Sequence, residues 1–407
     1  MEYIKRDIER KFLHMSSAFK AVMLVGARQV GKSTMLKHLA EGNRTYVSMD
    51  DLKMRDIARS DPKLFFQVYK PPILIDEVQK APELFEEIKI ICDSSDERGQ
   101  FWLTGSQSKK LVKNAGDTLA GRLCIIHMYS LSTREKLNVH PENSLEFSID
   151  SLLERKKLFP KNNLLSTFNN IWMGGMPDVQ TMDPEQLYEY FNSYVDTYLM
   201  KDAVEDYGIV NVDAFKKFLR GCAAFTGQLV NYEDLGNSAG VSAVTAKEWV
   251  AVLKSMGIIF LLEPFFSNKL KRLVKKPKLY FCDTGLCAYL SSWTNKEVLM
   301  NGAVSGHYFE NYVIAELLRN YSYGKDNINL NFYRNNKKQE IDLIIEANGI
   351  LHPVEIKKTA SPDKGAIKNF SLLNDPQRQT GTGAVFCMSE DILPIDRNNI
   401  IIPANII

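Results

Sequence analysis

The fold of this 407-residue chain is decided by one stretch, Gly26-Ala27-Arg28-Gln29-Val30-Gly31-Lys32-Ser33-Thr34. A short apolar run precedes it, and a helical spacing of apolar residues follows it. The two glycines let the backbone curl so that successive N–H groups face one point, and the positive end of the following helix adds to that field. This G-x-x-x-x-G-K-S spacing between a strand and a helix predicts a phosphate-binding loop, or P-loop.

The polar groups of the loop have expected roles on a nucleoside triphosphate. Gly26 and Gly31 form the backbone cradle, and Lys32 is expected to reach the β- and γ-phosphates. The Ser33 hydroxyl is expected to bind Mg²⁺, and Thr34 completes the cofactor-binding set. We therefore expect ATP and Mg²⁺ as cofactors.

Three further positions fit the same site. An apolar run ends in Asp76-Glu77, where Asp76 suits the Mg²⁺ shell and Glu77 suits the orientation or deprotonation of the attacking water. A second run ends in small polar groups, of which Ser106, or alternatively Thr104, is expected to sense the γ-phosphate. Arg122 is expected either to present its guanidinium to a nucleotide, in cis or across a subunit contact, or to be solvated or ion-paired.

These motifs resemble those of the AAA-type P-loop ATPases, which combine a Walker A loop, a Walker B acid pair and a polar sensor. Over nearly its whole length the chain is similar to a prokaryotic family in which this ATPase precedes a C-terminal half of unknown function. The strings that carry this likeness have no assigned catalytic role, and we expect them to serve core or interdomain packing. They are Gly174-Gly175-Met176-Pro177, Tyr194-Val195-Asp196-Thr197-Tyr198, Thr226-Gly227-Gln228-Leu229-Val230 and Lys278-Leu279-Tyr280-Phe281-Cys282-Asp283-Thr284-Gly285-Leu286.

The middle of the chain has the pattern of a helix-turn-helix. Residues 231–256 predict two helices that meet at Gly240, with Ser242 capping the second, and a strand-like run follows. A winged helix is therefore expected, with the segment Lys269–Lys278 near its wing. That segment has six basic residues and no acid, so it could contact DNA phosphates, or serve as a solvated edge or a protein-docking surface.

A second chemical constellation lies near the C-terminus. Asn348-Gly349 is a strong two-residue hairpin signal between two strand-like segments. A two-residue turn there sets Asp342 opposite Glu355, and Glu340 opposite Lys357, on one face of the hairpin. Opposed carboxylates destabilise a sheet unless something compensates, and a divalent cation would do so.

This geometry predicts metal-dependent phosphodiester cleavage, in which Asp342 and Glu355 hold Mg²⁺ or Mn²⁺ and Lys357 orients or activates the water. The pattern resembles that of the PD-(D/E)XK nuclease superfamily, which implies Glu310 as a further metal-binding acid on a preceding helix. Ile341 stands where the superfamily has a Pro. The alternative is a structural hairpin with a surface ladder of Glu and Lys.

Together the patterns predict an α/β protein of three domains. We expect a parallel-sheet P-loop NTPase domain of AAA type at 1–140 and a helical linker with a winged-helix domain at 141–290. An α/β restriction-endonuclease-like domain of PD-(D/E)XK type is expected at 291–407.

Composition limits the partners. The chain has 51 Lys and Arg against 49 Asp and Glu, which excludes a uniformly basic nucleic-acid binder, so any DNA contact must be a local patch. The six cysteines form no C-x-x-C pair, which favours reduced thiols in a cytoplasmic protein. Residues 1–11 contain no apolar signal-peptide core, and the longest apolar runs, such as 257–262, are far below the ~20 residues of a membrane span, so no membrane partner is expected.

The leading hypothesis is an ATP-binding, Mg²⁺-dependent ATPase that acts on DNA, with self-association left open. The resemblance adds an ATP-regulated nuclease in mobile-element or phage conflict. The alternative is a nucleotide-switched DNA- or protein-binding module whose nuclease fold is catalytically inert.

Overall fold

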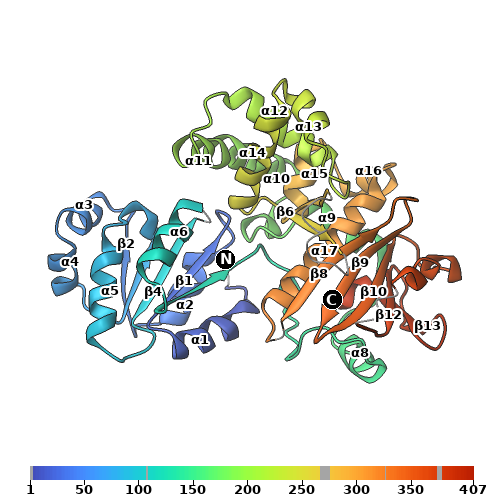
Figure 1. Ribbon diagram of the computed structural model, residues 1–407, viewed down its shortest axis with the longest axis horizontal. Helices are drawn as coiled ribbons and strands as arrows, with labels where there is room; N and C mark the ends of the chain where they lie inside the picture. The colour runs from blue at the N-terminus through green and yellow to red at the C-terminus, as the bar shows by residue number, and fades with distance from the viewer. Residues whose placement is uncertain (1–2, 107–108, 266–275, 326, 374–377) are drawn as a thin grey trace. The chain divides into compact units, whose positions relative to one another are not determined.

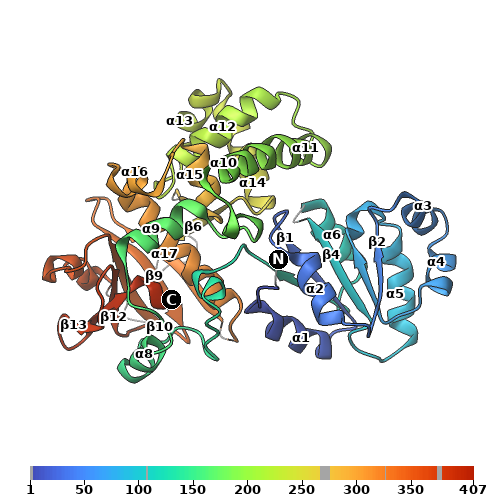
Figure 2. The same cartoon turned by 180° about the vertical axis from the view of Figure 1, so that it is seen from behind.

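The computed structural model describes residues 3–106, 109–265, 276–325, 327–373 and 378–407 (Figures 1 and 2). The chain divides into two compact units. The first contains Met1–Leu131 with the short segments Glu205–Gly208 and Ser255–Ile258, and the second contains the rest.

The first unit is built on a five-stranded sheet with the order β2-β3-β4-β1-β5, in which every pair is parallel. Its strands are β1 (Ala21–Gly26), β2 (Thr45–Ser48), β3 (Ile73–Asp76), β4 (Phe101–Ser106) and β5 (Leu123–His127). Its helices are α1 (Ile8–Ala18), α2 (Lys32–Ala40), α3 (Leu52–Ser60), α4 (Pro62–Val68), α5 (Leu84–Ser94) and α6 (Lys109–Thr118). The predicted parallel-sheet P-loop domain is thereby confirmed.

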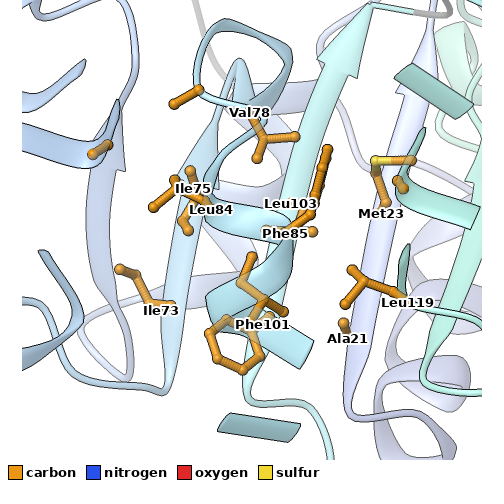
Figure 3. Close-up of a cluster of buried hydrophobic side chains, with 14 of the residues drawn as sticks. Ala21, Met23, Ile73, Ile75, Val78, Leu84, Phe85, Phe101, Leu103 and Leu119 are labelled. Atoms are coloured by element: carbon orange, nitrogen blue, oxygen red, sulfur yellow. The ribbon is translucent and has the colours of Figure 1, made fainter. Parts of the chain in front are cut away.

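The core of this sheet shows why the strands read as continuous apolar runs. Every residue of β1 and β3 is buried, as expected for strands covered on both faces. Figure 3 shows one covered face, where alternate strand residues pack together. The labelled strand residues are Ala21, Met23, Ile73, Ile75, Phe101 and Leu103, and Leu84 and Phe85 of α5 lie against them.

The second unit contains a nine-stranded mixed sheet with the order β13-β14-β12-β10-β9-β8-β6-β7, and β11 pairs with β10. Its strands are β6 (Ile259–Pro264), β7 (Lys278–Phe281), β8 (Ile328–Arg334), β9 (Glu340–Ala347), β10 (Ile350–Lys357), β11 (Gln379–Thr380), β12 (Gly383–Cys387), β13 (Leu393–Pro394) and β14 (Asn399–Pro403). Because β6 pairs with β8, this sheet continues across residue 290. The predicted middle and C-terminal domains therefore share one compact unit, and the three-domain division stays a prediction.

The helices of the second unit are α7 (Thr133–Lys136), α8 (Ile149–Lys156), α9 (Leu164–Met173), α10 (Pro184–Ser193), α11 (Met200–Glu205), α12 (Val212–Ala224), α13 (Tyr232–Ala239), α14 (Ala243–Ser255), α15 (Thr284–Leu290), α16 (Lys296–Asn301) and α17 (Ser305–Ser322). Along the described ranges, no helix has the length and apolar character needed to cross a membrane.

The predicted helix-turn-helix corresponds to α13 and α14. Gly240 ends α13 at a φ of 70°, and the Ser242 hydroxyl caps α14 by accepting the Thr245 N–H at 3.1 Å. Helix α12 packs on α14 through edge-to-face contacts of its phenylalanines with Trp249. The antiparallel pair β6/β7 follows. Residues 269–275 of the basic segment lie outside the described residues.

Two of the strings that carry the family resemblance meet at Asp283. Its Oδ1 caps α15 by accepting the Gly285 N–H at 3.0 Å, and its Oδ2 accepts the Gly175 N–H at 2.8 Å. Gly174 has a φ of 74°, and a Cβ there would lie 2.2 Å from Asp283 Oδ1. These strings therefore serve packing, as expected.

Helix α17 is anchored at two points along its length. Asn311 bonds β7 through the N–H and the carbonyl of Phe281, both at 2.8 Å. Further along the helix, the buried Glu316 accepts the Thr133 N–H at 3.1 Å and an Nη1–H of Arg319 at 3.1 Å. The segment that begins with Ser132, where the second unit starts, is thereby tied to α17.

Candidate functional site

The P-loop lies at the carboxyl edge of the first sheet. Register pairs Gly26 of β1 with Ser106 of β4 and places Asp76 at the end of β3, so the three strand ends meet at one edge. A Cβ on Gly26 would lie 2.2 Å from a backbone carbonyl oxygen, and Gly31 has a φ of 93°, which favours glycine. Both glycines are therefore required by the loop geometry.

The two polar side chains of the loop are already held in place. The Lys32 ammonium donates to the carbonyls of Gly26 at 3.0 Å and Ala27 at 2.8 Å, and the residue is only 6% exposed. The Ser33 hydroxyl donates to Asp76 Oδ1 at 2.6 Å. Thr34 is exposed in the first turn of α2. Ser33 and Asp76 thus form the oxygen pair that the sequence predicted for Mg²⁺.

Asp76 is the centre of a wider hydrogen-bond network. Besides Ser33, it accepts from the Tyr46 hydroxyl at 3.0 Å and from the hydroxyl of Thr104. Thr104 is fully buried, and its hydroxyl also accepts the backbone N–H of Glu77 at 3.0 Å. One threonine hydroxyl therefore positions both residues of the acid pair.

Glu77 has an unusual backbone and a restrained side chain. Its φ of 56° lies in the left-handed region, which is uncommon for a residue other than glycine. Its carboxylate accepts a hydrogen bond from the side-chain amide of Gln79. In the described part of the chain, the buried Oε1 of Gln79 has no hydrogen-bond partner. Gln79 therefore holds the side chain expected to act on water.

Two residues predicted for this site, Ser106 and Arg122, are not confirmed as parts of it. Of the sensor alternatives, the structure brings Thr104 to the acid pair, while the side chain of Ser106 lies outside the described residues. Arg122 precedes β5, whose first residue pairs with the start of β1, so it lies at the sheet edge opposite the P-loop. There its guanidinium pairs with Asp93 at 2.5 and 3.0 Å and lowers the pKa of that carboxyl. Of the alternatives left open for Arg122, the structure shows the ion pair.

The hairpin register near the C-terminus is as predicted. Asn348 and Gly349 both have positive φ, as a two-residue turn of this kind requires. The pairs run from Ile350 with Ala347 to Val354 with Leu343. Beyond the last pair the ladder opens, and the Asp342 carboxylate accepts the backbone N–H of Ile356 at 2.9 Å.

The two opposed acids lie in a poorly solvated position. Burial raises the pKa of Asp342 well above its usual range, and the negative charges of Glu310 and Glu355 raise it further. Burial also raises the pKa of Glu355, against the hydrogen bond that Lys357 donates at 2.5 Å. Glu355 is 8% exposed, and within the described ranges its buried Oε2 has no hydrogen-bond partner.

A lysine that the sequence reasoning did not place here completes the cluster. Lys278 of β7, 3% exposed, lies 2.9 Å from Glu310 Oε1 and 2.5 Å from Glu340 Oε1. Burial lowers its pKa, but the surrounding carboxylates outweigh burial and raise it overall. The side chain of Glu340, which was expected to lie opposite Lys357, forms ion pairs with Lys278 and Arg334.

Asp342 and Glu355 open onto a pocket of about 540 Å³. Lysines and polar groups line it together with the acids: Lys338, Glu340, Asp342, Glu355, Lys357, Thr359, Ser361, Pro362, Asp363, Gly365, Ala366, Lys368 and Asn369. Over the described ranges, no three His, Cys, Asp or Glu side chains are grouped as a ready set of metal ligands. The unpartnered oxygen of Glu355, beside Asp342, fits a divalent cation held by two carboxylates.

Three family models match separate parts of the chain. Residues 18–137 match a family model described as an AAA domain. Residues 166–297 match a domain of unknown function, DUF8612, and residues 305–407 match another, DUF4143.

Relatives extend over most of the chain. An uncharacterised protein of Mycobacterium tuberculosis is 25% identical over 404 residues, which are 98% of this chain and 84% of that one. An uncharacterised protein of Haemophilus influenzae is 22% identical over 320 residues, 73% of this chain and 74% of that one. Among solved structures, a Walker-type ATPase of Pyrococcus abyssi has a TM-score of 0.43 at 13% identity, covering 71% of this chain and 96% of that one, which is too distant to support an argument. By its sheet order, its P-loop and its family match, the N-terminal part of this chain is an AAA-type P-loop ATPase domain.

Proposed function

We propose that this protein hydrolyses ATP with Mg²⁺ in its first unit and uses nucleotide turnover to control an action on DNA by its second unit. The observation that carries the first half is the hydrogen-bond chain from Ser33 through Asp76 and Thr104 to Glu77. It joins the expected metal ligands to the expected water-activating residue.

We assign roles in hydrolysis to Lys32 and Ser33 of the P-loop and to both residues of the acid pair. The Lys32 ammonium, now on two loop carbonyls, exchanges them for the β- and γ-phosphate oxygens. Ser33 and Asp76, whose Oγ and Oδ1 atoms lie 2.6 Å apart, would hold Mg²⁺, which neutralises phosphate charge when bound. Glu77 orients the water for in-line attack and takes its proton, after its carboxylate leaves the Gln79 amide.

The test is ATP turnover, measured as phosphate release, with binding of a fluorescent ATP analogue in parallel. Lys32→Ala should weaken both binding and turnover, whereas Glu77→Gln should keep binding and lower turnover by roughly 10²–10⁴-fold, the usual worth of a general base. Lys63→Ala, an exposed lysine of α4, is the matched charge control. Full turnover by Lys32→Ala would show that the P-loop assignment is wrong.

For the second unit we propose metal-dependent cleavage of phosphodiester bonds at the acidic hairpin. The specific observation in favour is a carboxylate oxygen of Glu355, beside Asp342, that has no hydrogen-bond partner among the described residues and lies at a pocket whose lining includes three lysines. Asp342 and Glu355 hold Mg²⁺ or Mn²⁺, and Lys357 orients the attacking water. The helix-turn-helix α13–α14 and the basic segment Lys269–Lys278, except for its buried last residue, supply the DNA contact, and self-association remains part of the proposal.

The nuclease proposal is tested with plasmid and single-stranded DNA, Mg²⁺ or Mn²⁺, with and without ATP. Asp342→Ala is compared with wild type, and Glu346→Gln, on the same strand but paired with Arg378, is the control. Cleavage lost only in Asp342→Ala supports the proposal. If wild type and Asp342→Ala leave DNA equally intact, the second unit is a nucleotide-switched DNA- or protein-binding module with an inert nuclease fold.

A further inference from the structure

Lys278 forms ion pairs with two carboxylates of the acidic cluster rather than with one. Its ammonium contacts two carboxylates, Glu310 at 2.9 Å and Glu340 at 2.5 Å. Two residues further along the same strand, and so on the same face, the Tyr280 hydroxyl donates to the same Glu310 Oε1 at 2.5 Å. This carboxylate oxygen thus accepts two hydrogen bonds from β7, which use both of its lone pairs.

The backbone around Lys278 is fixed on both sides. Lys278 pairs with Leu262 of β6 and forms a bridge to Leu229. With its side chain 4% exposed, the ammonium cannot turn to solvent unless β7 itself moves. A buried ammonium is tolerated only where carboxylates compensate its lost hydration, so Lys278 and the acids stabilise one another.

We propose that Lys278 is the resident cation of the carboxylate cluster: it occupies Glu310 and Glu340, so that a divalent cation is held by Asp342 and Glu355 alone. This inference rests on the metal role proposed above for Asp342 and Glu355. It differs from the sequence expectation, in which Glu310 is itself a metal ligand.

The consequence is a competition between an ammonium and a metal for the same negative charge. With Lys278 in place, the cluster offers two carboxylates. Without it, Glu310 is released toward Asp342, whose electrostatic contact with Glu310 is already felt in the present structure. Removing Lys278 should therefore increase the affinity for a divalent cation, by roughly 10–100-fold, the scale on which groups around a metal site change affinity.

The experiment is a calorimetric titration of the nucleotide-free full-length chain with Mn²⁺. All proteins carry Ser33→Ala, so that the P-loop does not contribute. Lys278→Met is expected to bind Mn²⁺ at least 10-fold more tightly than the Ser33→Ala parent, and Mn²⁺ is expected to raise its unfolding temperature more. Lys278→Arg, which keeps the charge, is expected to behave like the parent. Equal or weaker binding by Lys278→Met overturns the proposal.

A second variant keeps the proposal testable if Lys278→Met fails to fold. Because Lys278 already occupies Glu310, Glu310→Gln in the parent is expected to weaken Mn²⁺ binding by less than about 10-fold, below the 10–100-fold scale of groups that act on a metal. A loss of 10-fold or more would show that Glu310 is a ligand beside Lys278 and would overturn the inference.

The outcomes also separate this inference from the nuclease proposal. If the parent binds Mn²⁺ through Asp342 and Lys278→Met binds no better, the inference fails and the nuclease proposal stands. If Mn²⁺ binds only after Lys278→Met, Asp342 and Glu355 hold no cation beside Lys278, and both the inference and the nuclease proposal fail. If neither protein binds Mn²⁺, both fail.

Discussion

Replacing Thr104 with Val tests whether one hydroxyl organises the ATPase site. Valine keeps the shape of the buried side chain but removes the hydroxyl that donates to Asp76 and accepts the Glu77 N–H. The N–H of Glu77 is then left without a partner at a left-handed backbone position. Thr104→Val should therefore damage both the stability of the first unit and the placement of Glu77.

The magnitude follows from the two bonds. A hydrogen bond to a charged group contributes roughly 1.5–3 kcal/mol, and an unsatisfied buried N–H costs about 1–3 kcal/mol. Together the two effects amount to about 2.5–6 kcal/mol; since Ser33 and Tyr46 still donate to Asp76, we expect the lower part of this range, about 2.5–4 kcal/mol in the free energy of unfolding. Loss of alignment at Glu77 should lower kcat by roughly 10–100-fold, which corresponds to about 1.4–2.7 kcal/mol.

The assay is phosphate release at saturating ATP and Mg²⁺, with thermal unfolding measured on the same samples. Because the Lys32 ammonium is held by the carbonyls of Gly26 and Ala27, which the substitution leaves unchanged, KM for ATP should change little. Thr104→Ser keeps the hydroxyl and should restore most of the turnover, which a purely steric role would not explain. If Thr104→Val turns over ATP at the wild-type rate, or if Thr104→Ser is equally impaired, Thr104 does not organise this site.

Three further outcomes are expected. Burial lowers the pKa of Lys136 to about 8, so on raising the pH the folded state loses this proton before the unfolded state does. The free energy of unfolding in urea, measured relative to Lys136→Met, should therefore rise between pH 8 and about 10.5. A difference between the two proteins that does not change with pH would contradict this. Gly26→Ala places a Cβ against a backbone carbonyl and should lower stability by about 1–3 kcal/mol and weaken ATP binding, whereas Gly116→Ala, with open space around it, should do neither. Gln79→Leu frees the Glu77 carboxylate and should raise basal turnover roughly 3- to 10-fold, about the worth of one hydrogen bond, while a fall would show that Gln79 assists the reaction.

The features of the structure that depend on a few consecutive residues, the P-loop and the hairpin turn, were predicted correctly from the sequence. The spacing of Gly26 and Gly31 requires a tight loop between a strand and a helix, and the structure has one. Asn348-Gly349 permits few turns other than a two-residue hairpin, so the register of β9 and β10 followed directly. These predictions needed no knowledge of distant segments.

Contacts between distant segments could not be predicted in this way. Tyr46 reaches Asp76 because β2 pairs with β3, and the sequences of these two strands do not predict that they are neighbours in the sheet. Lys278 was counted with the basic segment Lys269–Lys278, although its spacing of two from Tyr280 on a strand is the one signal that both face the same way. The position of Arg122 was available from the sequence, because a residue that precedes a parallel strand lies at the edge opposite the P-loop.

Helix α17 connects the acidic cluster of the second unit to the backbone at Thr133. Glu310 and Glu316 lie six residues apart on this helix, which is about 9 Å along its axis. The first contacts Lys278 in the acidic cluster, and the second grips the backbone at Thr133, just after the chain leaves the first unit. If the backbone at Thr133 moves while its bonds to Glu316 stay intact, α17 must move with it, and Glu310 and, through Asn311, strand β7 are then carried along as one body.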